Sequence, residues 1–270
     1  MPPTLPVVSE AMAEIHDSAA RGFALATKAY EEARPTYPAK AAERLERELH
    51  LKPGRDVLDL AAGTGKLTAL LLGTGATVVA VEPVAEMRAA LERALPGVAA
   101  LPGTAEAIPL ADGSVDAVTV GQAFHWFQGD AALAEIHRVL REGGGLGLVW
   151  NVRDTSVPWM ARLTAIMEGH RGDAPAYRTG AWREAFARTT LFEPLHEAQV
   201  AHVHHLTPEG VVARVSSVSF VAALPASQRE RVLGEVRELL ATDPSTRDRA
   251  QIELPYRTEI FWTTRRALAA

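Results

Sequence analysis

An acid followed by small residues at alternate positions marks residues 57–68 as a stretch that can do chemistry. Asp59 ends an apolar run, and Ala61, Gly63 and Gly65 follow it. A strand that runs through such a turn into a helix points backbone N–H groups and a helix N-terminus at a ligand above the turn. Side chains no larger than a methyl group let the ligand approach the main chain closely. The stretch predicts a ligand-binding turn, and the alternative is a glycine-rich βα turn that binds nothing.

Two phosphate-binding patterns fit this turn poorly. A P-loop requires Gly-x-x-x-x-Gly-Lys-Ser/Thr, but Leu60 and Leu67 stand where its first glycine and its Ser/Thr belong. A dinucleotide site requires Gly-x-Gly-x-x-Gly, and Thr68 stands at the third glycine. The sequence therefore excludes a P-loop and weakens a dinucleotide site without excluding it. It satisfies a third pattern, acid-x-small-x-Gly-x-Gly.

A second acid, Glu82, follows the next apolar run. An acid about 20 residues after the glycines, at the end of the second strand, is placed to bind the hydroxyl groups of a ribose. This holds for any adenosine-type ligand, so Glu82 does not indicate which of these ligands the turn binds. Met87 begins the following helix, where it either packs against an adenine ring or fills the core.

Residues 121–127 are expected to surround the reacting centre, because ligands of open α/β sheets lie beyond the carboxyl ends of the strands. Phe124 and Trp126 there, and Trp182 further along, suit a pocket that excludes water. His125 is the nearest candidate for a catalytic general base. A histidine that only lines the pocket or forms a hydrogen bond is the commoner outcome.

The elements that would position these residues follow from the hydrophobic pattern. Helices are predicted at residues 39–49, 66–72 and 131–140, from Met87 onward, and twice within 158–188; the glycines at 143–145 are expected to end the helix at 131–140. Strands are predicted at residues 57–60, 77–81, 98–101, 115–120, 146–151, 196–205 and 252–264. This alternation predicts an α/β fold with a doubly wound parallel sheet.

The composition favours a cytoplasmic protein with no nucleic-acid or membrane partner. The 270-residue chain is 47% hydrophobic, has a formal net charge of −5 and contains no cysteine. A negative charge without a basic stripe argues against nucleic acid, and the lack of cysteine excludes disulfides and thiolate chemistry. Residues 67–84 are too interrupted to span a bilayer, and residues 1–10 lack the pattern of a signal peptide.

Two further groups of residues have competing interpretations. His202, His204 and His205 suggest a metal, but no acid cluster accompanies them, so no metal is expected. Arg34 precedes a proline break and is either a solvated loop residue or part of a lid whose guanidinium pairs with a carboxylate. Arg214 is a further candidate to reach the substrate, together with Ser217 and Arg257.

Together the motifs resemble those of class I S-adenosylmethionine-dependent methyltransferases, in the small-molecule subgroup that includes trans-aconitate methyltransferase-like proteins. The matches cover most of residues 20–151 in order: Tyr30…Arg34-Pro-Thr-Tyr-Pro38, residues 57–65, Val81-Glu-Pro83 with Met87, Gly103-Thr-Ala-Glu106, Gln122-Ala-Phe-His-Trp-Phe127 and Glu135…Arg138-Val-Leu…Gly143-Gly144. An ordered set of this kind is far more specific than any single motif.

The resemblance implies a Rossmann-like sheet of seven strands, mostly parallel, whose last strand is antiparallel. We expect a single methyltransferase domain over residues 1–270. Its parts are an N-terminal helical lid at residues 1–50, a cofactor-binding core at 51–153, an inserted helical lid at 154–195, and strands and helices at 196–270 that complete the sheet.

The resemblance also implies S-adenosylmethionine as cofactor and S-adenosylhomocysteine as product. It implies contacts of the methionine moiety near Asp59, Ala61 and Gly63, and of the ribose with Glu82. Met87 and the segment 105–106 are implied around the adenine, and residues 122–125 around the methyl group. The full set of expected cofactor contacts is Tyr30, Arg34, Asp59, Ala61, Gly63, Thr64, Gly65, Glu82, Pro83, Met87, Thr104, Ala105, Glu106, Gln122, Ala123 and His125.

The predicted activity is in-line transfer of a methyl group to a small-molecule acceptor in a desolvated pocket. Such a reaction needs little from side chains beyond alignment and the exclusion of water. The alternative is a protein that binds S-adenosylmethionine without turnover, and a nicotinamide-dependent dehydrogenase is a more distant one. The acceptor and the oligomeric state are not predicted.

Overall fold

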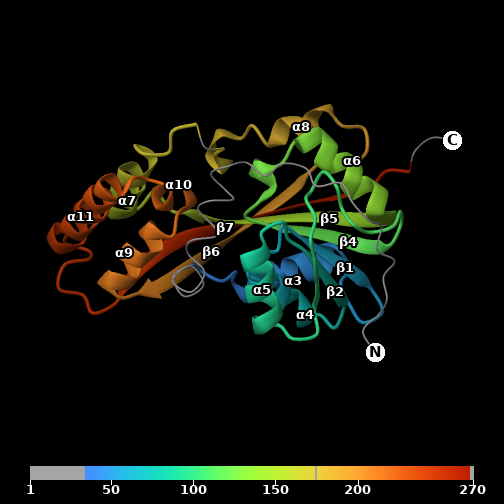
Figure 1. Cartoon of the computed structure of the whole chain (residues 1–270), viewed down its shortest axis with the longest axis horizontal. Helices are drawn as coiled ribbons and strands as arrows, with labels where there is room; N and C mark the ends of the chain where they lie inside the picture. Colours follow the sequence, from blue (N-terminus) through green and yellow to red (C-terminus); the bar gives the residue numbers. More distant parts are fainter. Residues whose placement is uncertain (1–33, 174, 268–270) are drawn as a thin grey trace.

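The computed structural model describes residues 34–173 and 175–267, which form one mixed sheet with helices on both sides (Figure 1). The order of strands across the sheet is β3-β2-β1-β4-β5-β7-β6. The strands are β1 (Asp56–Leu60), β2 (Thr77–Val81), β3 (Ala99–Leu101), β4 (Val115–Gly121), β5 (Leu140–Arg153), β6 (His196–Leu206) and β7 (Ile252–Thr264).

The direction of the strands confirms the predicted fold class. β1 pairs in parallel with β2 and β4, and parallel pairing continues to β3 on one side and β5 on the other. β7 runs antiparallel to both β5 and β6. Every predicted strand is present, and all except β5 begin and end within one residue of the prediction. Continuous apolar runs between turn residues explain this agreement, because a strand buried on both faces needs them.

β5 begins earlier than predicted, and the expectation that glycines at 143–145 end the preceding helix is wrong. That helix, α6 (Gly129–Val139), ends before them, and the glycines lie within β5. The pairing of β4 with β5 shifts register between Val115 and Ala117, next to these glycines. At Gly147, further along β5, an added Cβ would lie 2.7 Å from Leu45 of α3 (Ala39–Glu48). Small residues in β5 therefore let α3 pack closely on the sheet.

The remaining helices follow the strands as connections or cover their ends. They are α4 (Lys66–Leu72), α5 (Ala85–Ala94), α7 (Pro158–Glu168), α8 (Arg183–Arg188), α9 (Pro208–Ser216), α10 (Ser219–Ala222) and α11 (Ala226–Thr242), with the short 3-10 helices η1 (Phe124–Trp126) and η2 (Tyr177–Thr179). Among the described residues, no helix is long and apolar enough to cross a membrane.

Two apolar cores cover the two faces of the sheet. On one face, Leu45 of α3 and Leu71 of α4 pack with Val57 of β1. On the other face, Ile136 of α6 and Ala185 of α8 pack with the next strand residue, Leu58. Successive strand residues point to opposite faces, so the continuous apolar run of β1 contributes to both cores.

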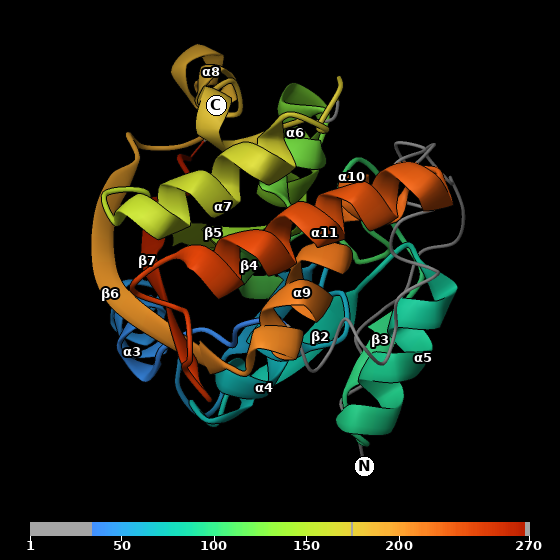
Figure 2. The ribbon, with the colours of Figure 1, turned by 90° about the vertical axis from the view of Figure 1, so that its left-hand side faces the viewer.

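A third core lies at one end of the molecule, where α7, α9, α10 and α11 gather around the end of β7 (Figures 1 and 2). β4 ends at Gly121, which pairs with Val149, so β5 continues past it paired only with β7. This extension of β5, β7 and β6 carries the four helices. It thereby adds a helical wall beyond the end of the parallel part of the sheet.

The structure describes part of the expected N-terminal lid and nearly all of the expected inserted lid. Residues 1–33 of the N-terminal lid, including Tyr30, lie outside the described residues, and residues 39–48 form α3 against the sheet. The segment 154–195 supplies Met160 of α7 to the third core and Trp182 to the core with α6 and α8. A lid function for these segments stays a prediction.

Candidate functional site

The turn between β1 and α4 has the unusual backbone that its small residues predict. Ala61, Gly63 and Gly65 have φ angles of 54°, 58° and 87°. Glycine adopts this left-handed region freely, whereas an alanine there costs about 1–2 kcal/mol. Strained residues of this kind cluster at ligand clamps and active sites. Ala61 therefore marks the turn as a candidate site.

Gly63 and Gly65 have different surroundings. A Cβ added at Gly63 would meet only the sulfur of Met87, at 3.9 Å. A Cβ added at Gly65 would lie 2.9 Å from Leu95 and 3.0 Å from Leu91 of α5. Gly63 lines the cavity above the turn, whereas Gly65 does not line it and packs against α5. Gly65 was predicted to contact the cofactor, but it does not lie at the cavity wall.

Glu82 joins the end of β2 to this turn. Its Oε2 accepts a hydrogen bond from the backbone N–H of Gly63 at 2.9 Å, and its Oε1 accepts one from the N–H of Val84 at 2.9 Å. Burial raises the pKa of the Glu82 carboxyl group, while these two N–H groups oppose the rise. Each carboxylate oxygen has a second lone pair. Glu82 is therefore held in place and still able to accept hydrogen bonds from a ligand.

Asp59 is completely buried at the end of β1. Its Oδ2 accepts a 2.6 Å hydrogen bond from the Thr68 hydroxyl, and the Thr119 hydroxyl lies 3.3 Å from its Oδ1. Burial raises the pKa of Asp59 to about 7, against the effect of the two hydroxyl groups. Thr68, which replaces the third glycine of a dinucleotide motif, thus anchors Asp59 beneath the turn.

A cavity of about 620 Å³ lies at the carboxyl ends of β1, β2 and β4. This volume is in the usual range for a small-molecule or cofactor pocket. Most of the predicted cofactor contacts line it: Arg34, Asp59, Ala61, Gly63, Thr64, Glu82, Pro83, Met87, Thr104, Ala105, Glu106, Gln122 and Ala123. Two predicted contacts among the described residues, Gly65 and His125, do not line it, and a third, Tyr30, lies outside the described residues.

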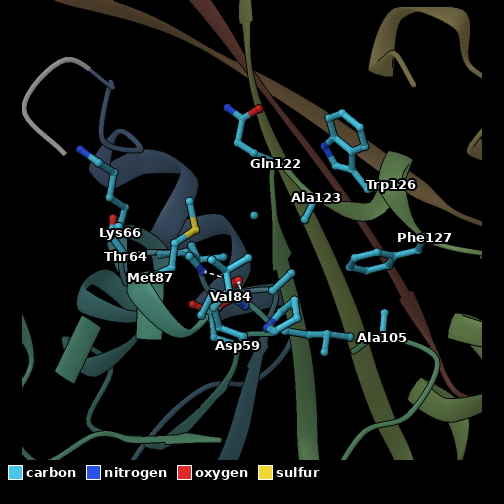
Figure 3. Close-up of a pocket in the computed structure, with 18 of the residues that line it drawn as sticks. Asp59, Thr64, Lys66, Val84, Met87, Ala105, Gln122, Ala123, Trp126 and Phe127 are labelled. Atoms are coloured by element: carbon cyan, nitrogen blue, oxygen red, sulfur yellow. Dashed lines mark hydrogen bonds between the residues drawn. The ribbon is translucent and has the colours of Figure 1, made fainter. Parts of the chain in front are cut away.

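The cavity separates two walls (Figure 3). Thr64, Lys66 and Met87 lie on the side of the glycine turn and α5. Gln122 and Trp126 lie on the other side, after β4. Gln122 has a φ of 61°, and its backbone N–H donates to Val149 O at 2.9 Å. The chain thus bends sharply after β4 and brings Gln122, Ala123, Trp126 and Phe127 to the cavity wall.

His125 faces away from this cavity, in contrast to the prediction. The indole Nε1–H of Trp150 donates to His125 Nδ1 at 3.3 Å, so the imidazole proton is on Nε2. Burial, with Arg171 and Arg34 nearby, lowers the pKa of His125 to about 3. His125 lines a second hollow beside α8, together with Phe124 and Trp182. Of the expected aromatic wall, Trp126 lines the main cavity, while Phe124 and Trp182 do not.

Two lining residues were not among the predicted cofactor contacts. Lys66, considered in the sequence analysis only as part of a failed P-loop, donates from Nζ to the backbone oxygen of Arg34 at 2.8 Å. Arg214 of α9, named only as a weak substrate candidate, also lines the cavity. Arg34 Nη2 donates to Ser217 O at 3.2 Å, which joins α9 to the rim. Cationic side chains from three segments that are far apart in the sequence therefore meet at the rim of the cavity. No local sequence pattern predicts this arrangement.

One buried group of the cavity wall lacks a partner. The hydroxyl oxygen of Thr104 is buried and has no hydrogen-bond partner among the described residues. A buried polar group without a partner is costly, so such a group in a cavity wall points to a ligand that supplies one. The neighbouring Glu106 is engaged, since its Oε1 accepts from Gln128 N at 2.9 Å.

The histidines of β6 lie on both faces of the strand. Within the described residues, no group of three or more His, Asp and Glu side chains is arranged to hold a metal ion. His202 and His204 are partly buried on the inner face of β6, whereas His205 is exposed on the other face. This separation follows from the strand, because neighbouring residues point to opposite faces.

Comparisons with known proteins agree with this geometry. A family model described as a methyltransferase domain matches residues 58–148, which contain the turn, Glu82 and the segment after β4. The chain is 44% identical over 239 residues to an uncharacterized methyltransferase of Mycobacterium tuberculosis, covering 87% of this chain and 92% of that protein. It is 37% identical over 233 residues to an uncharacterized methyltransferase-like protein of Schizosaccharomyces pombe, covering 86% and 91%.

A solved structure shares the fold. A protein of Anabaena variabilis, described as a candidate methyltransferase from an antibiotic biosynthesis pathway, matches with a TM-score of 0.62. The match covers 85% of this chain and 98% of that chain at 22% sequence identity. At this identity the likeness supports the architecture and carries no argument about the substrate.

Proposed function

Because the chain belongs to the class I S-adenosylmethionine-dependent methyltransferases, we propose that it methylates a small-molecule acceptor by in-line displacement in the 620 Å³ cavity. The proposal includes the small-molecule subgroup named in the sequence analysis, and S-adenosylhomocysteine as the product. The observation that carries it is the fixed position of Glu82 against the backbone of Gly63, at the floor of a cavity of suitable size.

The residues of the cavity fit this cofactor. The backbone of residues 61–64 would receive the methionine moiety, and Glu82 would accept hydrogen bonds from the ribose hydroxyls. Arg34 and Lys66 lie at the rim, where their charges suit the cofactor carboxylate.

The adenine would lie against Met87 and Ala105, with the buried Thr104 hydroxyl free to bind a ring nitrogen. A threonine hydroxyl can donate or accept, so it suits a heterocycle that offers both kinds of group.

The bound cofactor supplies an electrophilic methyl group on a sulfonium, whose positive charge is lost on transfer. The chain has to align the acceptor with that methyl group and exclude water, which can contribute about 7 kcal/mol or more in favourable cases. Gln122, Ala123 and Trp126 form the wall suited to this task. His125 is neutral and faces away, so we do not assign it the role of base.

The second candidate is a protein that binds S-adenosylmethionine without turnover, and a nicotinamide-dependent dehydrogenase is the third. Thr68 disfavours the third candidate, since its hydroxyl is bound to Asp59 where a dinucleotide motif needs glycine. The wall at residues 122–123 borders the same cavity as the glycine turn, which favours the enzyme over the binding protein, because an acceptor can lie there beside the cofactor.

Calorimetry followed by a transfer assay tests the proposal. We expect the full chain to bind S-adenosylmethionine and S-adenosylhomocysteine, and to bind NAD at least a hundredfold more weakly. Incubation with methyl-labelled S-adenosylmethionine and a small-molecule extract should then give a labelled product. Binding without any labelled product would favour the non-catalytic candidate. Preferential binding of NAD would overturn the proposal.

A further inference from the structure

Arg214 brings a guanidinium group to the rim of the cavity, and it has no acidic partner among the described residues. Its Nη1 lies 3.4 Å from the Ser217 hydroxyl, and its Nε is buried without a hydrogen-bond partner among the described residues. The ion pairs found among those residues do not include Arg214. A buried guanidinium nitrogen without an acceptor is costly, so this arrangement points to a ligand group that supplies one.

The groups around Arg214 are basic as well. His204 lies on the inner face of β6, and its Nδ1 is buried without a partner among the described residues. Burial lowers the pKa of His204 to about 4, and Arg214 and His202 contribute to the shift, as do Lys66 and His205. Arg153, at the end of β5, also lies close enough for Arg214 to help lower its pKa, which burial brings to about 10. This end of the cavity therefore favours an anion.

The carboxylate that lies beside Arg153 is also bound by a second arginine. Glu168 of α7 forms hydrogen bonds of 2.6 Å and 2.7 Å to Arg171, and its distance to Arg153 Nη2 is 3.5 Å. Its charge is thus shared by two other arginines. The positive charge of Arg214 is left for a group that enters the cavity.

We propose that Arg214 binds an oxyanion of the methyl acceptor, a carboxylate or a phosphate, and thereby sets the substrate class. The inference rests on the proposed function, since it concerns the acceptor of that reaction. A guanidinium group offers a planar pair of N–H donors, which matches either oxyanion.

Calorimetry on the full chain saturated with S-adenosylhomocysteine tests this inference. The probes are glutarate, methyl phosphate and the neutral glutaramide, at constant ionic strength. We expect one of the two anions to bind at least tenfold more tightly than glutaramide, and the preferred anion identifies the oxyanion. Arg214→Gln should weaken binding of that anion at least tenfold. Arg231→Gln, on the exposed side of α11, is the matched control and should change it less than twofold.

The affinity for S-adenosylhomocysteine separates this inference from the proposed function. If Arg214→Gln weakens that affinity tenfold and leaves anion binding unchanged, Arg214 belongs to the cofactor site and the inference is overturned. Equal binding of glutarate, methyl phosphate and glutaramide, or no binding of any of them, also overturns it. Failure of the wild type to bind S-adenosylhomocysteine contradicts the proposed function instead. Arg214→Lys keeps the charge but loses the planar pair, so an intermediate loss is expected even if Arg214→Gln does not fold.

Discussion

Glu82 Oε2 accepts a 2.9 Å hydrogen bond from the backbone N–H of Gly63, so the acid after β2 is fixed to the turn after β1. The two elements that we propose to bind adenosine are therefore one unit, although 19 residues separate them in the chain. A carboxylate held in this way loses little further conformational entropy when a ribose binds. This relationship explains why the two motifs occur together.

We predict that Glu82→Ala weakens binding of S-adenosylmethionine by about 1–3 kcal/mol, the cost of leaving ribose hydroxyl groups without their acceptor. Isothermal titration calorimetry measures the loss. Glu86→Ala, at an exposed position four residues later, is the control and should leave the affinity unchanged. Equal affinities of Glu82→Ala and the wild type would contradict the ribose assignment.

Asp59 should make the protein less stable as the pH rises from about 4 to about 7. Burial raises its pKa from the usual 3.8 to about 7 in the folded state, so the folded state binds a proton that the unfolded state releases in this range. The free energy of unfolding therefore falls by about 4 kcal/mol, since one pKa unit corresponds to about 1.4 kcal/mol. The loss is complete above the folded pKa.

Urea unfolding of the wild type and of Asp59→Asn at several pH values measures this effect. The difference between their free energies of unfolding should change between pH 4 and 7 and level off above pH 7. Thr68→Val removes a hydrogen bond that favours the ionised carboxylate. This substitution should therefore raise the pH above which the difference in free energy of unfolding levels off. A difference that does not vary with pH would show that Asp59 titrates normally.

His125 should remain neutral, with its proton on Nε2, from pH 8 down to pH 5. Its pKa is about 3 in the folded state, below the usual value of 6.5. Between these two pH values the unfolded state binds a proton that the folded state does not, so stability is lost as the pH falls from 6.5 to about 3. Long-range ¹H–¹⁵N spectra of the imidazole report the tautomer and any titration. Trp150→Phe removes the indole donor and should change the Nδ1 resonance. Titration of His125 near pH 6.5 in the wild type would return it to the list of candidate bases.

Gly65→Ala should destabilise the protein more than Gly54→Ala. Both glycines have φ angles near 87°, so both substitutions carry the same backbone cost of about 1–2 kcal/mol. A Cβ at Gly54 meets nothing within 4 Å, whereas a Cβ at Gly65 meets Leu91 and Leu95. Overpacking of this kind adds about 1–3 kcal/mol. Chemical denaturation compares the two variants, and equal losses would show that α5 moves aside without cost.

Local patterns in the sequence determined the secondary structure and the half of the cavity that we propose for the cofactor. Apolar runs between turn residues predict the strands, and Ala61, Gly63 and Glu82 lie where an acid and small residues at strand ends should lie. These predictions depend on residues close together in the chain. The number of strands and the antiparallel last strand came from the resemblance of the ordered motifs to a family, whereas the order of the strands came only from the structure.

Tertiary structure decided the direction of side chains and the contacts between distant segments. His125 belongs to the predicted segment, yet the turn of η1 points its ring at Trp150, 25 residues away. Gly65 fits the motif but contacts α5, and Gly144 and Gly145 lie in a strand where their spacing suggested the end of a helix. Arg214 reaches the cavity because the extension of β5, β7 and β6 carries α9 to its rim. Periodicity reports which face of an element is buried, whereas the partner on that face depends on how the whole chain packs.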